Sequence, residues 1–149
     1  LNTPKSDGFK YETSMATSKS MQIAVDKATL NAVNNLQASI ESDMETFRKN
    51  VQEEKGFQQE SNIMESFSNT IGVTIAGTLK GYEVVKKDFQ QNGEVWTAFV
   101  LIEYDEGAAH QRILDAIKRD KELYDAIRTA ELMEEMEDKV EAYRKRREQ

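Results

Sequence analysis

The chain has 149 residues, of which 27 are acidic and 20 are Lys or Arg, and its formal net charge is −7. This length fits one domain, the acidic balance disfavours nucleic acid as a partner, and the absence of cysteine excludes disulfides and thiolate zinc sites. No apolar run approaches the roughly 18 residues that a membrane span requires. The first residue is Leu1 rather than methionine, so we expect a processed or trimmed N-terminus.

The N-terminal segment divides into an arm and a strand. Residues 1–8 contain the only proline and show no periodicity, which predicts an extended arm. Residues 9–17 alternate between two kinds of side chain, and this period of two predicts a half-buried β-strand. One side of the strand carries Phe9, Tyr11, Thr13 and Met15.

A long amphipathic helix is predicted from Ser18 to about Glu53. This stretch contains no glycine or proline, and its apolar residues recur at steps of three and four, which predicts a helix about 50 Å long. The apolar residues are Met21, Val25, Ala28, Ala32, Leu36, Ile40, Met44, Phe47 and Val51. A serine at position 18 or 20 is expected to cap the first turn, and Gly56 to end or bend the helix.

A shorter helix is expected over residues 58–70, because apolar residues again recur at helical spacing. Its inward side chains are Ile63, Met64, Phe67 and Ile71. The next segment, residues 72–77, is rich in β-propensity and predicts a β-region. Gly72 and Gly77 have part of the spacing of a phosphate-binding loop, but Thr78 stands where that loop requires lysine. We therefore interpret both glycines as a turn into the sheet.

A β-hairpin is predicted around Asn92-Gly93. Strand-like residues run from Thr78 to Phe89 and from Glu94 to Tyr104. An Asn-Gly pair between two such runs favours a type I′ turn, in which both central residues have positive φ.

The second hairpin strand is apolar on both faces, whereas a half-exposed antiparallel strand has one polar face. One face carries Trp96, Ala98, Val100, Ile102 and Tyr104, and the other carries Val95, Thr97, Phe99 and Leu101. We expect this strand to be central with cover on both sides, or buried against another molecule. The second set is therefore predicted to bind a partner.

Residues 107–147 predict one continuous last helix, roughly 60 Å long, with one skipped turn at Asp120. Such a helix outruns a small sheet, so its distal part is expected to project and to meet a partner. Thioether side chains adapt easily to partner surfaces. The predicted partner-binding residues of this helix are Met133, Met136, Val140 and Tyr143. Acidic residues at 131–138 and basic residues at 144–147 are expected to pair head to tail between copies.

Candidate catalytic and metal-binding residues are few. His110 is the only imidazole, so a Ser-His-Asp triad would require it together with a carboxylate such as Asp105 or Asp115. In a polar first turn, a surface histidine is the ordinary outcome. The carboxylates at 41–45 and 131–138 lie on predicted helices and indicate solvated faces rather than a cation site. We predict no catalytic residues, no metal and no cofactor.

Several of these segments together resemble a known family. They are Ala16-Thr-Ser-Lys-Ser-Met-Gln-Ile-Ala24 with the small and apolar positions that follow it, Gly81-Tyr-Glu-Val-Val-Lys-Lys, Gly93, and Trp96-Thr-Ala-Phe-Val-Leu-Ile. Over roughly residues 9–104 the chain is similar to the LPP-20 lipoprotein family of bacterial envelope proteins. The resemblance implies a small-residue helix on an antiparallel sheet, and a kinship with proteins that build rings or disks around the flagellar motor. The lipid-bearing cysteine of a mature lipoprotein is missing here.

The predicted fold is α+β: a small antiparallel sheet, made of the N-terminal strand plus the hairpin, packed on a long helix, with a long C-terminal helix. We expect an arm at 1–8, an LPP-20-like domain at 9–106 and a helical extension at 107–149. The predicted function is a non-enzymatic, self-assembling structural protein of the bacterial cell envelope (periplasm or outer membrane) or exterior, as a ring, tube or filament subunit. The alternative is a monomeric periplasmic small-molecule-binding module. We expect a homo-oligomer, no nucleic acid, and membrane association only through an anchor not present in this chain.

Overall fold

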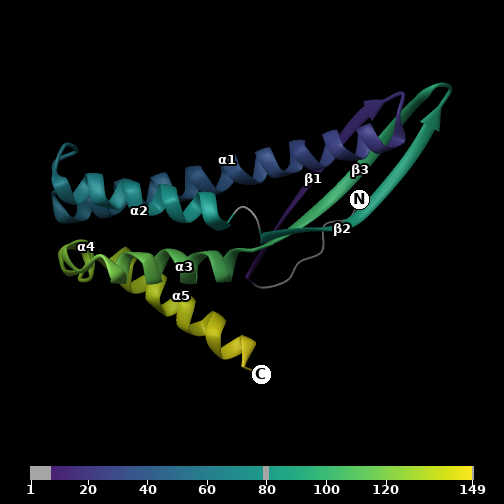
Figure 1. Cartoon of the computed structure of the whole chain (residues 1–149). Helices are drawn as coiled ribbons and strands as arrows, with labels where there is room; N and C mark the ends of the chain where they lie inside the picture. Colours follow the sequence, from purple (N-terminus) through teal and green to yellow (C-terminus); the bar gives the residue numbers. More distant parts are fainter. Residues whose placement is uncertain (1–7, 79–80, 149) are drawn as a thin grey trace. The chain divides into compact units, whose positions relative to one another are not determined.

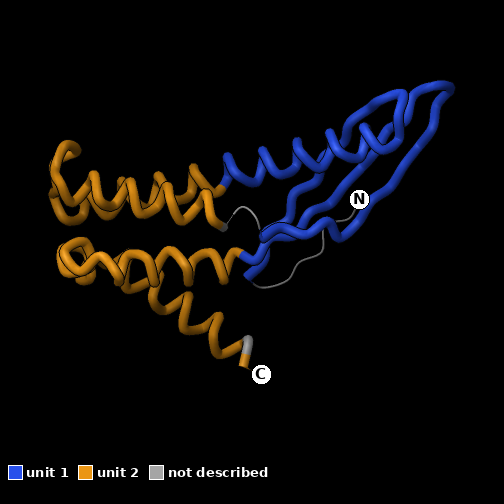
Figure 2. Tube along the Cα trace, in the orientation of Figure 1, with its two compact units in different colours: residues 1–39, 79–105 blue, residues 40–78, 106–149 orange. Residues whose placement is uncertain are grey.

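The computed structural model describes residues 8–78 and 81–148, and Figure 1 shows its helices and strands. The predicted α+β fold class is confirmed. The chain forms two compact units, coloured separately in Figure 2. Unit 1 combines residues 1–39 with 79–105, and unit 2 combines residues 40–78 with 106–149. The predicted domain 9–106 is thus shared between the units, and the predicted arm lies, except for Gly8, outside the described residues.

The sheet of unit 1 is antiparallel throughout, with the strand order β1-β3-β2. Its strands are β1 (Phe9–Ser18), β2 (Tyr82–Asn92) and β3 (Val95–Asp105). The predicted N-terminal strand and hairpin are both confirmed. Because β3 is central, β1 and β2 are the edges of the sheet.

The hairpin turn differs by one residue from the predicted one. Asn92 pairs with Val95, so Gly93 and Glu94 are the central residues. Gly93 has a φ of 64°, and no described residue other than glycine has a positive φ. A positive φ at the first central residue alone is typical of type II′, so the type I′ prediction is wrong. Glycine takes the left-handed position because it has no Cβ to clash.

Helix α1 (Met21–Lys55) begins and ends close to the predicted residues. The Ser20 Oγ accepts a hydrogen bond from the Ile23 N–H at 3.3 Å, which caps the first turn. Gly56 follows the helix with a φ of 71°, the left-handed conformation that commonly ends helices. Both predicted boundaries are confirmed.

The first part of α1 packs on one face of the sheet (Figure 1), and its side chains toward the sheet are small. Ala24, Ala28 and Ala32 are fully buried at successive steps of four. The Lys10 Nζ donates to the Ser39 Oγ at 3.2 Å, so the side of β1 that carries Lys10 faces the helix. The β3 residues in register with that side are Trp96, Ala98, Val100, Ile102 and Tyr104.

Unit 2 contains the second part of α1 and four further helices. They are α2 (Asn62–Thr78), α3 (Glu106–Arg119), α4 (Lys121–Ile127) and α5 (Glu131–Arg147). Helices α2 and α5 both pack against α3.

The predicted β-region at 72–77 is helical and belongs to α2, so that prediction is wrong. The buried residues of α2 keep helical spacing through this segment, and the burial of one helical face overrides β-propensity. They are Met64, Phe67, Ile71 and Ile75. Gly72 and Gly77 therefore stand within a helix rather than in a turn or a phosphate-binding loop.

The predicted single helix at 107–147 is three helices, and its distal part has cover within unit 2. The Asp120 Oδ1 accepts a hydrogen bond from the Leu123 N–H at 3.2 Å and starts α4. Ala130 is extended, and α5 begins with the Glu131 N–H donating to both carboxylate oxygens of Glu54 at 2.9 Å. These two breaks let α5 pack on α3. The expectation that the distal part of this helix projects beyond the rest of the fold is therefore wrong.

Candidate functional site: the open face of the sheet

The eight predicted partner-binding residues fall into two groups. Met133, Met136, Val140 and Tyr143 are buried among the helices of unit 2. Val95, Thr97, Phe99 and Leu101 share the face of β3 that points away from α1, because they alternate with the residues that face the helix. The structure thus brings the second group together on one surface and places the first group inside.

We call this second surface the open face of the sheet. It consists of Thr13, Met15 and Thr17 of β1, Val95, Thr97, Phe99 and Leu101 of β3, and Lys86, Asp88 and Gln90 of β2. Within unit 1, no described helix other than α1 lies on the sheet, and α1 lies on the opposite side. The open face is therefore the face of this sheet that no described helix of unit 1 covers.

The apolar side chains of the open face lie on β3 and at Met15 of β1, whereas its β2 margin is polar. Met15 lies in register with Phe99, and Phe99 with Asp88. Met15 is 58% exposed and Phe99 is half-buried, whereas Leu101, in the middle of the central strand, is fully buried. The open face therefore places two apolar side chains next to each other at the surface, with polar side chains of β2 beside them.

Met15 was not among the predicted binding residues. It alternates with the β1 residues on the side of Lys10, whose ammonium donates to Ser39 of α1. Met15 therefore points away from α1, onto the open face. Tyr11, on the same side as Met15, donates its hydroxyl to the Glu103 Oε2 at 2.9 Å and is satisfied within the sheet.

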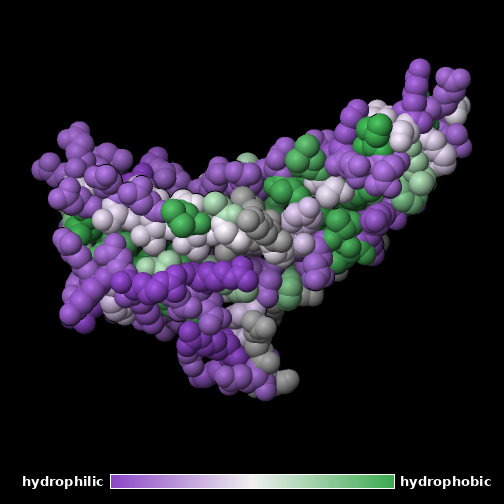
Figure 3. All heavy atoms as spheres, in the orientation of Figure 1, coloured by the Kyte–Doolittle hydropathy of each residue, from purple (hydrophilic) through white to green (hydrophobic). Residues whose placement is uncertain are grey.

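Most of the exposed large apolar side chains belong to unit 1. On the face of the molecule that Figure 3 draws, hydrophobic residues lie separately among polar ones. The exposed large apolar residues of unit 1 are Phe9, Met15, Met21, Ile23, Leu30, Val85, Phe89 and Val95. In the described part of unit 2, Val73 is the one such residue. Single exposed apolar residues are ordinary, so Met15 beside Phe99 is the informative case.

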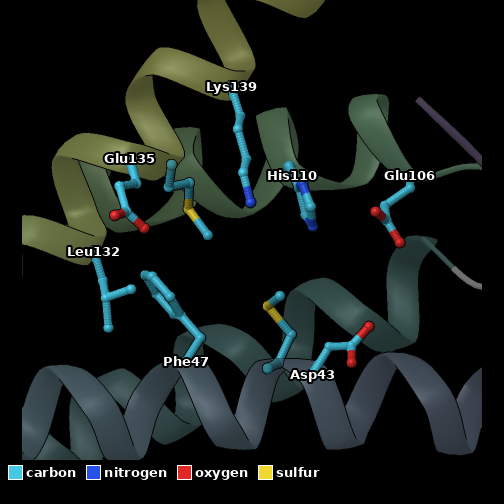
Figure 4. Close-up of a pocket in the computed structure, with 9 residues that line it drawn as sticks. Asp43, Phe47, Glu106, His110, Leu132, Glu135 and Lys139 are labelled. Carbon is cyan, nitrogen blue, oxygen red and sulfur yellow. The ribbon is translucent and has the colours of Figure 1, made fainter. Parts of the chain in front are cut away.

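Unit 2 contains a pocket of about 240 Å³ between α1, α3 and α5 (Figure 4). It is lined by Asp43, Met44, Phe47, Glu106, His110, Leu132, Glu135, Met136 and Lys139. Figure 4 shows the Lys139 side chain reaching from α5 toward the pocket, with His110 on α3 beside it. The described lining includes no serine, threonine, cysteine or tyrosine, so this pocket offers no hydroxyl or thiol nucleophile beside His110.

Arg48 is a buried cation that the helical pattern did not indicate. It is only 5% exposed, and its guanidinium donates to Glu45 through Nε at 3.1 Å and Nη2 at 2.5 Å. The hydrogen bonds from Arg48 lower the pKa of Glu45 below its ordinary 4.5, against the opposing effect of desolvation. The Nη1 of Arg48 has no hydrogen-bond partner among the described residues.

In the described ranges, no three His, Asp or Glu side chains are grouped so that they could hold a metal ion. None of the helices there is both long enough and apolar enough to cross a bilayer. Comparison with protein-family models, curated proteins and solved structures found no match for this chain.

Proposed function

We propose that this protein is a non-enzymatic structural subunit that assembles with copies of itself through the sheet of unit 1. The observation that carries the proposal is the open face, where Met15 and Phe99 lie side by side in register. An antiparallel sheet covered by a helix on one face normally turns polar side chains to water on the other. Here β3 turns apolar side chains in both directions, so covering the open face lowers the free energy.

The size of this effect shows what else assembly requires. Fully burying a Met or Phe side chain stabilises by about 1.5–3 kcal/mol, and Met15 is 58% exposed, so its burial contributes about 1–2 kcal/mol per copy. Association costs an estimated 4–15 kcal/mol in lost translational and rotational freedom. Apolar contact at Met15 and Phe99 is therefore a part of the interface, and further bonds between copies must complete it.

A place in the bacterial cell envelope or outside the cell is supported by the resemblance of residues 9–104 to the LPP-20 lipoproteins. That resemblance implies a small-residue helix on an antiparallel sheet, and α1 packs on its sheet through alanines. A ring, tube or filament is the form of assembly that we propose on the same basis.

Sedimentation velocity over a range of protein concentrations tests the proposal. We expect the wild type to sediment faster than a 17.0 kDa monomer as its concentration rises. Met15→Asp should weaken the association, because a carboxylate at the interface loses its hydration. Leu30→Asp is the matched control, since Leu30 is 59% exposed and also belongs to unit 1, but lies on α1. A wild type that stays monomeric at every concentration, with both variants alike, contradicts the proposal.

A second candidate function, a monomeric small-molecule-binding module, is supported by the pocket of unit 2. Its volume of about 240 Å³ lies just below the roughly 300–1,000 Å³ of ordinary ligand pockets, so it suits a small ligand. Its polar lining offers carboxylates from Asp43, Glu106 and Glu135 and the ammonium of Lys139. A thermal-shift screen with small amino acids and amines tests this function. A ligand that raises the melting temperature of the wild type, but not of His110→Ala, together with monomeric sedimentation, favours it.

A further inference from the structure

We infer that two copies join edge to edge, with β1 of one copy antiparallel to β1 of the other, so that their sheets continue as one six-stranded sheet. This inference rests on the proposed self-assembly and names its contact. The partner is a second copy of this chain, and the bonds are the backbone hydrogen bonds that the apolar contact at Met15 does not supply.

The two edge strands of the sheet differ in how well they are protected against pairing with a strand of another molecule. The β2 edge has a bulge between Val84 and Lys86, and three exposed charged residues follow each other at 86–88. Bulges and lysines on an edge strand are the usual devices that prevent pairing with another sheet. The β1 edge has no bulge, because its register with β3 is unbroken from Phe9 to Ser18, and its one lysine, Lys10, donates to the Ser39 Oγ of α1 at 3.2 Å.

The sequence of β1 also suits pairing with itself. Residues 13–18, Thr-Ser-Met-Ala-Thr-Ser, contain no charge, proline or glycine, which is the pattern of segments that pair strand to strand between molecules. In an edge strand, every second residue turns its N–H and C=O outward. For residues 12–18 these groups have no backbone partner outside β3 in the part of the chain that the structure describes.

Symmetry then limits the register. Residues opposite each other in an antiparallel pair point to the same face, so a symmetric pair of β1 strands must be centred on a residue. Overlap along the whole strand places that centre at Thr13 or at Ser14. With the centre at Ser14, Glu12 lies opposite Ala16 and Lys10 opposite Ser18 of the other copy, so no like charges meet.

The same construction fails for β2. Its middle residue is Lys87, so a symmetric β2 pair that overlaps along the whole strand places Lys87 directly opposite its own copy. Like charges in that position are destabilising. The charges, the bulge and the composition thus favour β1 over β2 as the edge that pairs with another copy. A pair of β1 strands also places the open faces of both copies on one continuous surface.

Cysteine cross-linking tests the contact directly, because the chain has no cysteine and a single introduced thiol can bond only to another copy. Opposed residues in an antiparallel pair have Cα atoms about 4.5–5.5 Å apart, within the range that a disulfide spans. We expect Thr13→Cys or Ser14→Cys to give a disulfide-linked dimer under mild oxidation. Lys87→Cys, at the middle of the other edge, is the matched control and should remain largely monomeric on non-reducing gels.

Sedimentation provides an independent measurement. Thr13→Lys adds a charge to the β1 edge and should raise the dissociation constant about tenfold, whereas Gln90→Lys on the β2 edge should leave it nearly unchanged. Circular dichroism melts of both variants check that these exposed substitutions leave the fold intact. Assembly of the wild type without cross-links at 13 or 14, or with equal cross-links at 87, overturns the edge contact and leaves the proposed function standing. A wild type that is monomeric at all concentrations overturns both.

Discussion

Replacing a helical glycine by alanine usually stabilises a protein, but at Gly107 we expect the same replacement to destabilise it. Gly107 lies in the first turn of α3 and is buried against Tyr143 of α5. A Cβ built at 107 would overlap the Cδ2, Cε2 and Cγ atoms of the Tyr143 ring. The ring is itself buried, so it cannot simply swing into solvent.

Two opposing terms set the size of the effect of Gly107→Ala. Alanine in place of glycine gains about 0.5–1 kcal/mol in helix propensity. Forcing an extra carbon into a packed contact costs about 1–3 kcal/mol. We therefore expect a net loss of about 1–2 kcal/mol in the free energy of unfolding. For a chain of this size, each kcal/mol corresponds to a fall of about 2–4 °C in Tm.

Urea unfolding followed by circular dichroism measures the effect, and Gly72→Ala is the matched control. Gly72 is also helical, but a Cβ there has no atom within 4 Å, so Gly72→Ala should stabilise by about 0.5–1 kcal/mol. In a Tyr143→Ala background the clash is gone, so adding Gly107→Ala should no longer destabilise. If Gly107→Ala stabilises the wild type as Gly72→Ala does, the close packing of α3 on α5 is refuted.

Three further predictions concern charged groups of unit 2. Arg48→Met should leave the free energy of unfolding unchanged or raise it by about 1–3 kcal/mol. The reason is that it removes a buried Nη1 without a hydrogen-bond partner among the described residues. A clear loss of stability in urea unfolding would show that the buried charge is required. Since the pKa of Glu45 is lowered in the folded state, its ion pair stabilises above pH 4.5 and is lost as the pH falls through the lower, folded-state pKa. The stability gap between wild type and Glu45→Gln should therefore shrink on acidification, and a gap that does not change with pH contradicts this. Glu54→Ala removes the carboxylate that accepts the first N–H of α5 and should cost about 0.5–2 kcal/mol in thermal melts, whereas an unchanged Tm argues against this cap.

Elements with local signals at their ends could be predicted from the sequence. Alternation from Phe9 predicted β1, a serine cap and Gly56 marked the ends of α1, and Gly93 marked the hairpin. The start of α5 has no such signal, because Ala130 makes no side-chain cap. Its cap is Glu54, a residue 77 positions away, which only the tertiary structure brings near. That is why the last helix was predicted to be continuous.

The candidate site was predictable in part for a similar reason. The alternation of β3 places Phe99 and Leu101 on one face in any fold, so the sequence sufficed to group them. Which of its two apolar faces a helix covers depends on α1, and alternation within β3 contains no information on that. The apolar residues of the last helix, from Met133 to Tyr143, have a helical spacing that suits a core or an interface equally well. Their burial in unit 2 follows from the turn before α5.

The interleaving of the two units has a consequence for the growing chain on the ribosome. Thr13 pairs with Leu101, so β1 is synthesised long before the central strand that completes its sheet. Helices α1 and α2 are both synthesised between β1 and β3. The sheet of unit 1 therefore cannot form until residues 40–78 of unit 2 have been synthesised. Contacts so distant in sequence slow folding. We therefore expect β1, with its uncharged residues 13–18, to spend this interval unpaired, in need of a chaperone or of rapid elongation before it meets another nascent copy.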